Sequence, residues 1–187
     1  GYRPGALVDK GFDAQHLARL KPGIIYTSLS AFGESGPWAE KRGFDSIVQS
    51  ATGFNVAEAH ACSPAQAAPK TTKQLKPCAL PVQILDFAAG FLIAYASQVA
   101  LIRRAQEGGS WEVKVSLLQT ANWLRSLGQK GFNKNASPID FRSVAASFPS
   151  TYGALKAMPH AAKFSDTPAQ FNKPSVAPGT HRAQWDD

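Results

Sequence analysis

One carboxylate stands at the head of a long apolar stretch of the 187-residue chain. Asp86 is followed by residues 87–96, which carry no charge and only one polar side-chain atom, that of Tyr95. Such a run predicts a helix buried on all sides, which Gly108 and Gly109 end. Asp86 could cap this helix, because a carboxylate accepts hydrogen bonds from the free amides of a first turn. Alternatively, it could be a nucleophile whose reaction the same amides assist. The residues alone favour the cap.

Composition indicates a globular chain with an anionic partner. With 44% hydrophobic and 18% charged residues, the chain can bury a core. Its 20 Lys and Arg against 13 Asp and Glu give a formal charge of +7, which suits a phosphorylated ligand or another polyanion. We expect no nucleic-acid partner, because no nucleic-acid-binding motif is present. We expect no membrane segment, because the apolar run breaks at Ser97 and Gln98 and ends at Arg103.

The cysteines indicate a reducing compartment. Cys62 and Cys78 are the only two, and they lack the C-x-x-C spacing of metal or redox sites. Reduced thiols are typical of cytosolic proteins, so we expect a cytoplasmic location and no metal site.

Helices and strands that alternate along the first part of the chain predict an α/β fold. Asp13 can cap a short helix whose apolar face consists of Phe12, Leu17 and Leu20. Residues 24–29 are apolar and β-branched, which predicts a central parallel strand.

A second helix is expected after the strand. The pattern predicts that Ile47, Val48 and Ala51 are its buried positions and that Gly53 ends it. The basic pair Lys41 and Arg42 precedes this helix and is either a phosphate contact or a solvated turn.

The following segment predicts a loop and then a second strand and helix. Residues 55–81 are rich in Ala, Pro, Lys and Gln, which is typical of a long mobile surface loop. Strict alternation in residues 111–115 predicts a strand with one solvent-exposed face. Ser116 and Gln119 form a capping box for a helix that ends at Gly128.

Five short motifs follow one another at a characteristic spacing. They are Tyr2–Leu7, Ser28–Pro37, Arg42–Gln49, Leu85–Gly90 and Gly108–Leu117. Together they resemble the class III CoA-transferases, the family of formyl-CoA transferase, carnitine CoA-transferase and alpha-methylacyl-CoA racemase. Each motif alone is weak, but five in register are specific. The resemblance extends over residues 1–127.

The resemblance implies a fold and an assembly. It implies an α/β fold, as part of an open, mostly parallel sheet domain with flanking helices, plus an extended C-terminal segment. Residues 1–127 would be the central part of the large domain, and residues 128–187 a linker and a partial small domain or tail. The family forms homodimers of interlocked chains, which we expect of the full-length protein. Because the chain starts at Gly1 without a Met, we expect a fragment that lacks the N-terminal part of this domain.

The resemblance also implies an activity. Asp86 matches the catalytic aspartate of an acyl-CoA:carboxylate CoA-transferase, which attacks an acyl-CoA thioester to form a mixed anhydride. Backbone amides from Phe87 to Gly90 are candidates for stabilising the oxyanion. Coenzyme A is then a substrate, and no tightly bound cofactor is expected. The residues that match the family's CoA contacts are Tyr2, Arg3, Arg42, Gly43, Phe44 and Asp45.

One position separates the transferases from the racemases. Phe44 stands where racemases of the family carry a histidine, and a phenyl ring cannot move a proton. An acyl-CoA racemase is therefore disfavoured. Two hypotheses without catalysis stay open: a non-catalytic or degenerate CoA-binding fragment in which Asp86 only caps a helix, and a generic polyanion binder.

Overall fold

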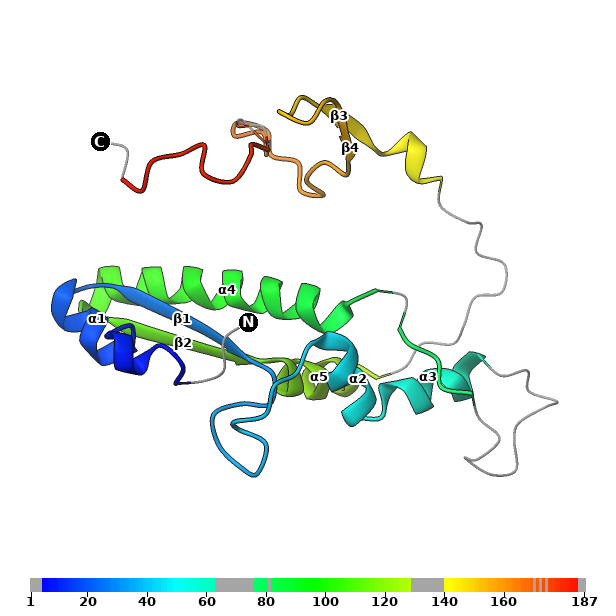
Figure 1. Cartoon of the computed structure of the whole chain (residues 1–187), viewed down its shortest axis with the longest axis horizontal. Helices are drawn as coiled ribbons and strands as arrows, with labels where there is room; N and C mark the ends of the chain where they lie inside the picture. The colour runs from blue at the N-terminus through cyan, green and yellow to red at the C-terminus, as the bar shows by residue number, and fades with distance from the viewer. Residues whose placement is uncertain are drawn as a thin grey trace. The chain divides into compact units, whose positions relative to one another are not determined.

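The computed structural model describes residues 5–62, 76–80, 82–128, 140–169, 171, 173 and 175–184. The chain divides into two compact units, Gly1–Phe132 and Asn133–Asp187, and each unit contains a small sheet (Figure 1). The assignment of residues 1–127 to a large domain stays a prediction.

A parallel pair of strands forms the centre of the first unit. β1 (Ile25–Ser30) pairs with β2 (Trp111–Ser116), in register from Ile25↔Trp111 to Ser30↔Ser116. The long α4 (Ile84–Glu107) packs against both strands (Figure 1). The α/β class and the parallel pairing are therefore confirmed. Of the described strands only β2 pairs with β1, so the central position of β1 stays a prediction.

Local capping signals in the sequence are confirmed. A 3-10 turn, η1 (Val8–Lys10), precedes α1 (Ala14–Leu20), and the Asp13 carboxylate accepts a hydrogen bond of 2.9 Å from the His16 amide. The Ser116 hydroxyl likewise accepts one of 3.2 Å from the Gln119 amide at the start of α5 (Leu117–Ser126).

The predicted apolar faces of the short helices are wrong in part. No residue of α1 is buried, and Phe12 and Leu20 are exposed. In α2 (Asp45–Ala51), Ile47 and Ala51 are exposed as well. The buried residues of α2 are Asp45, Val48 and Gln49. Two of these three are polar, and hydrogen bonds to the start of α4 compensate their burial, which a hydrophobic pattern cannot reveal.

The predicted loop over residues 55–81 is partly a helix. α3 (Phe54–Cys62) follows α2 after a short turn at Gly53. The φ of Gly53 is 77°, in the left-handed region that favours glycine. Residues 76–80 have no regular structure. Residues 63–75 and 81 lie outside the described part of the chain.

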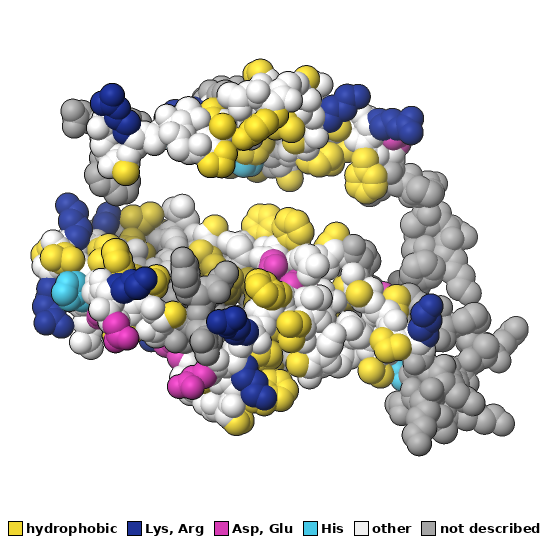
Figure 2. Space-filling view, viewed as in Figure 1, with side chains coloured by type: hydrophobic (Ala, Val, Ile, Leu, Met, Phe, Trp, Pro, Cys, Tyr) yellow, Lys and Arg dark blue, Asp and Glu magenta, His cyan; other side chains and the backbone are white. Residues whose placement is uncertain are grey.

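The prediction that α4 is buried on all sides is also wrong. Its buried residues are Leu85, Ala89 and Ala100. Phe87, Phe91 and Tyr95 are 62%, 78% and 70% exposed and lie at successive helical turns. Hydrophobic side chains are accordingly visible on the surface of the first unit (Figure 2).

The prediction that Gly108 ends α4 is confirmed. The prediction that the apolar stretch is too short to cross a membrane is not. Gly108 follows the helix with a φ of 73°. Among the described helices, only the 24-residue α4 is long and apolar enough to cross a membrane. Core helices of soluble proteins meet the same criterion, so this property alone indicates little.

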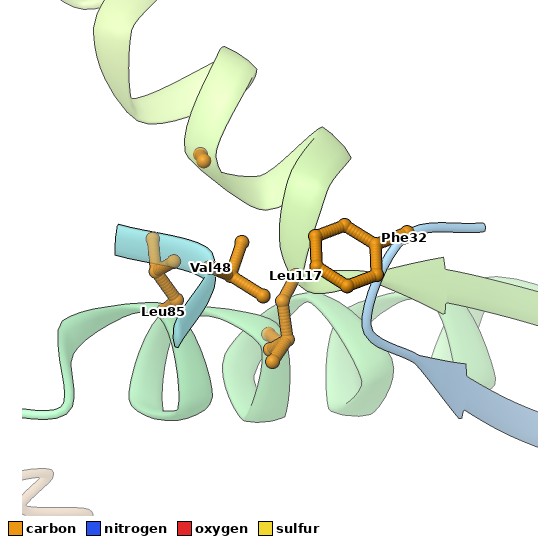
Figure 3. Packing of buried hydrophobic residues seen from close by; sticks show 6 residues of the cluster. Phe32, Val48, Leu85 and Leu117 are labelled. Atoms are coloured by element: carbon orange, nitrogen blue, oxygen red, sulfur yellow. The ribbon is translucent and has the colours of Figure 1, made fainter. Parts of the chain in front are cut away.

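A compact core holds the first turns of α4. Figure 3 shows Leu85 of α4 beside Val48 of α2, with Leu117 of α5 and Phe32 of the loop after β1 close by. The cluster is completed by Ala89 and Ala121. Full burial of one Leu or Val side chain contributes about 1.5–3 kcal/mol. The core therefore fixes the start of α4 against α2 and α5.

The second unit contains short elements only, among its described residues. η3 (Phe141–Ser143) precedes β3 (Ala146–Phe148), which pairs antiparallel with β4 (Leu155–Ala157). The described residues after β4 contain no helix and a single bridge, between Ser150 and Ser175. This agrees with the predicted extended segment.

Candidate active site

Asp86 lies inside the first turn of α4 and is not its cap. The helix begins at Ile84, and the N-cap residue is Gln83, whose side chain makes no capping hydrogen bond. Asp86 is exposed, and no group of the described residues donates a hydrogen bond to its carboxylate. The predicted capping role is therefore wrong, because α4 starts at Ile84, two residues before Asp86.

The carboxylate that caps α4 belongs to Asp45, the first residue of α2. Asp45 Oδ2 accepts hydrogen bonds from the amides of Leu85, at 2.7 Å, and Asp86, at 3.0 Å. The side-chain amide of Gln49 donates to the other oxygen, Oδ1. Asp45 is completely buried. A residue about 40 positions away thus satisfies the free amides at the start of α4.

The neighbouring amides of this turn are also occupied. The Ile84 amide donates to the Val82 carbonyl at 2.7 Å, and the Phe87 amide donates to the Gln83 carbonyl at 3.1 Å. The amides from residue 88 onward donate to carbonyls four residues earlier, as helix geometry requires. The prediction that amides of Phe87 to Gly90 stabilise an oxyanion is therefore wrong, since these donors already have acceptors.

Gln49 ties the segment before α4 to α2. Its Nε2 lies 3.3 Å from the Val82 carbonyl, and its Oε1 accepts a hydrogen bond of 3.2 Å from the Leu80 amide. Asp45 and Gln49 are one helical turn apart on the buried face of α2. Together they hold both the approach to α4 and its first turn.

Asp86 has an unusual electrostatic setting for a residue near a helix N-terminus. Partial desolvation and, second, the negative charge of Asp45 raise the pKa of Asp86 above its ordinary value of 3.8. A helix N-terminus ordinarily lowers the pKa of a carboxyl group, because its amides and dipole stabilise negative charge. Asp45 has taken these amides, so Asp86 keeps a more basic and therefore more nucleophilic carboxylate.

Gly43 permits the close approach that places α2. A Cβ at this position would lie 2.8 Å from Ala31 Cβ and 3.0 Å from the Phe32 ring, both in the loop that follows β1. Such distances are too short for any side chain. The absence of a side chain at residue 43 thus brings the start of α2 against the end of β1.

The predicted CoA contacts differ in how exposed their side chains are. Arg42 and Phe44 are exposed, Phe44 by 65%, and both have surface to offer a ligand. The Asp45 side chain is buried and engaged with α4, so it has none. This corrects its expected role as a direct CoA contact. Tyr2 and Arg3 lie outside the described residues.

A cavity lies where the strands end. It has a volume of about 570 Å³, and its walls include Ser30, Ser116, Tyr95 and Trp123. Ligands of open α/β sheets bind at this carboxyl edge, and the glycine-rich loop after β1 is the sequence signal for it. Asp86 does not line this cavity. No cluster of three or more potential metal ligands occurs among the residues that the structure describes.

Comparison with known proteins places the chain in a family. CoA-transferase family III matches residues 1–152, so the chain belongs to that family, as the five motifs indicate. It is 28% identical over 125 residues to the probable fatty acyl-CoA transferase Rv3272 of Mycobacterium tuberculosis, covering 67% of this chain and 29% of that protein.

A second relative and a solved structure give the same result. The succinate–glutarate CoA-transferase of Agrobacterium fabrum is 28% identical over 117 residues, which are 63% of this chain and 26% of that one. The crystal structure of Rv3272 from M. tuberculosis superposes with a TM-score of 0.55 at 28% identity, covering 67% of this chain and 32% of that one. The chain thus spans less than a third of the length of these relatives.

Proposed function

We propose that this chain is part of an acyl-CoA:carboxylate CoA-transferase in which Asp86 is the nucleophile. One observation carries the proposal. In a chain of CoA-transferase family III, the first turn of α4 presents an exposed carboxylate that receives no hydrogen bond from the described residues, while Asp45 occupies the amides beside it. A carboxylate with a structural role would use those amides itself.

The proposed reaction proceeds through acyl transfers at Asp86. A carboxylate oxygen attacks the thioester carbonyl of acyl-CoA, the C–S bond breaks, and a mixed anhydride and CoA thiolate result. The thiolate attacks the aspartyl carbonyl, which releases the first acid and leaves an aspartyl-CoA thioester. The incoming carboxylate attacks this thioester to form a second anhydride and thiolate. Thiolate attack on the new acyl carbonyl gives the product acyl-CoA and frees Asp86.

The proposal assigns CoA recognition to the first and third motifs. Arg42 is exposed and can pair with a phosphate of CoA, and Phe44 offers an exposed ring. Gly43 contributes through the backbone approach that it permits. Tyr2 and Arg3 belong to the proposed contacts by resemblance. CoA is a substrate here, with no tightly bound cofactor or metal, in a cytoplasmic homodimer of interlocked chains.

Trapping of the covalent intermediate tests the function. The full natural protein is incubated with acyl-CoA, treated with hydroxylamine and digested, and the peptide containing Asp86 is analysed by mass spectrometry. We expect an aspartyl hydroxamate at Asp86 in the wild type and in Asp9→Asn, which changes another exposed aspartate. An unmodified Asp86, together with full turnover in Asp86→Ala, would contradict the proposal and favour a non-catalytic CoA-binding fragment.

Deuterium exchange at the α-carbon of a chiral acyl-CoA separates transfer from racemisation. Phe44 supplies no proton, so we expect no exchange above background. Exchange that depends on Asp86 would favour a racemase.

A further inference from the structure

We propose that Asp45 is a positioning residue for the nucleophile: its buried carboxylate occupies the free amides at the start of α4, and the Asp86 carboxylate is thereby left without a donor and beside a negative charge. This proposal rests on the function proposed above and concerns how the same site obtains its reactivity.

The hydrogen bonds supply the first step. Both Leu85 and Asp86 donate their amides to a single oxygen of Asp45, at 2.7 and 3.0 Å. A carboxylate in the first turn of a helix ordinarily shares these donors, and the sharing reduces its basicity. With Asp45 in place, the amide of Asp86 is bonded to α2 instead of supporting its own side chain.

Rigid placement is the second step. Asp45 and the neighbouring Val48 of α2 are completely buried, and Gln49 is almost so. Leu85, next to Asp86, is also completely buried and packs in the same core (Figure 3). The main chain of Asp86 therefore has two anchors, a hydrogen bond to α2 and a buried neighbour. A displacement of about 1 Å at a reacting group can cost about a hundredfold in rate.

The charge of Asp45 is the third step. Desolvation is the main cause that raises the pKa of Asp86, and the negative charge of Asp45 on α2 is the second. A like charge beside the nucleophile keeps it basic, which an isolated helix start does not provide.

A purely structural cap would make different predictions from a positioning residue. A cap affects stability and leaves the protonation of Asp86 unchanged. A positioning residue affects both the rate and its dependence on pH. The test therefore compares pH profiles of kcat/KM and not activity at one pH.

Three variants of the full protein separate the two roles. For Asp45→Asn, which removes the charge, we expect the acid limb of kcat/KM to move to lower pH, and the plateau to fall about tenfold to a hundredfold. For Asp45→Glu, which keeps the charge but moves it, we expect a lower plateau with the acid limb unchanged. The control Asp13→Asn exchanges a cap carboxylate in α1 and should change neither.

Two results would overturn the proposal. The first is a folded Asp45→Asn variant with the wild-type acid limb, whatever its stability. The second concerns the wild type and applies if Asp45→Asn does not fold. Titration of the aspartyl carboxyl carbons by NMR should then give Asp86 a midpoint above 3.8, and a midpoint at or below this value refutes the proposal. Absence of a covalent intermediate at Asp86 would refute the proposed function alone, because the NMR titration does not depend on turnover.

Discussion

The starts of α1 and α4 solve the same problem in different ways. In α1, Asp13 caps its own helix by accepting the amide of His16, three residues later. In α4, the cap is Asp45 of another helix, 40 and 41 residues from the two amides that it accepts. Both arrangements satisfy free amides with a carboxylate. Only in α4 does an aspartate of the first turn, Asp86, receive no hydrogen bond from the described residues.

The two arrangements also shift carboxyl pKa values in opposite directions. The hydrogen bond from the His16 amide is the main cause that lowers the pKa of Asp13. Desolvation and then the charge of Asp45 raise the pKa of Asp86. A local cap thus stabilises the charge of its own aspartate, whereas a distant cap can make a neighbouring aspartate more basic. The comparison teaches that a helix start becomes a reactive site when the fold supplies its cap from elsewhere.

The largest expected effect is on catalysis by Asp86→Asn. The amide cannot attack a thioester, so CoA transfer should fall by at least about a thousandfold. Transfer is measured by chromatography of the acyl-CoA product, with Asp13→Asn as the matched change at the other helix start. If Asp86→Asn kept a tenth of the wild-type rate, the two helix starts would be functionally equivalent and the comparison would fail.

The next effect is on stability, in Asp45→Ala. Loss of the acceptor leaves the amides of Leu85 and Asp86 without their partner and removes one of the hydrogen bonds of Gln49, which should lower the free energy of unfolding by about 3 kcal/mol. Urea denaturation followed by circular dichroism measures this change. The exposed cap of α1 gives the contrast: Asp13→Ala should destabilise much less, and equal losses would show that the distant cap has no special role.

A smaller loss of stability is expected from Gly43→Ala, which disturbs the placement of α2 and thereby its contact with α4. The added Cβ would meet Ala31 Cβ at 2.8 Å, and relief of this overlap should cost about 1–2 kcal/mol. Gly90→Ala in α4 is the control, because a Cβ there meets nothing within 4 Å and should stabilise the helix by about 0.5–1 kcal/mol. Urea midpoints that move in the same direction would argue against a tight contact at residue 43.

The smallest effects concern the dependence of stability on pH. The lowered pKa of Asp13 means that its charge stabilises the fold above 3.8 and that this contribution is lost as the pH falls. The raised pKa of Asp86 has the opposite sign: its favourable contribution exists below 3.8, with the proton bound, and is lost as the pH rises through the folded value.

Asp13→Asn should therefore destabilise the protein at pH 7, and Asp86→Asn should stabilise it. Both differences should shrink toward pH 3, as measured by urea midpoints at the two pH values. Shifts of equal sign at pH 7 would remove the electrostatic distinction between the two helix starts.

Features that depend on neighbours in the sequence were predictable. The caps Asp13 and Ser116 and the ends at Gly53 and Gly108 are all found where the residues indicate. These signals act over a few residues, and the fold keeps them at these four positions, unlike the cap expected of Asp86. The parallel arrangement predicted for residues 24–29 is also found, in the pairing of β1 with β2.

Burial was predicted less well. A run without charges suggested that α4 is enclosed, yet Phe91 and Tyr95 are exposed, because burial depends on which face meets another element. Residues 55–62 looked like a loop from composition but form α3. For Asp45, the family motif predicted a ligand contact, and no local pattern indicated that its side chain turns inward to α4.

By itself, the sequence determined the family, the α/β alternation and the position of one carboxylate next to an apolar helix. Only the tertiary structure decided which aspartate caps that helix, because the choice depends on a hydrogen bond between residues about 40 positions apart. Side chains compete for a small number of free amides. The fold settles that competition by bringing the buried face of α2 to the start of α4.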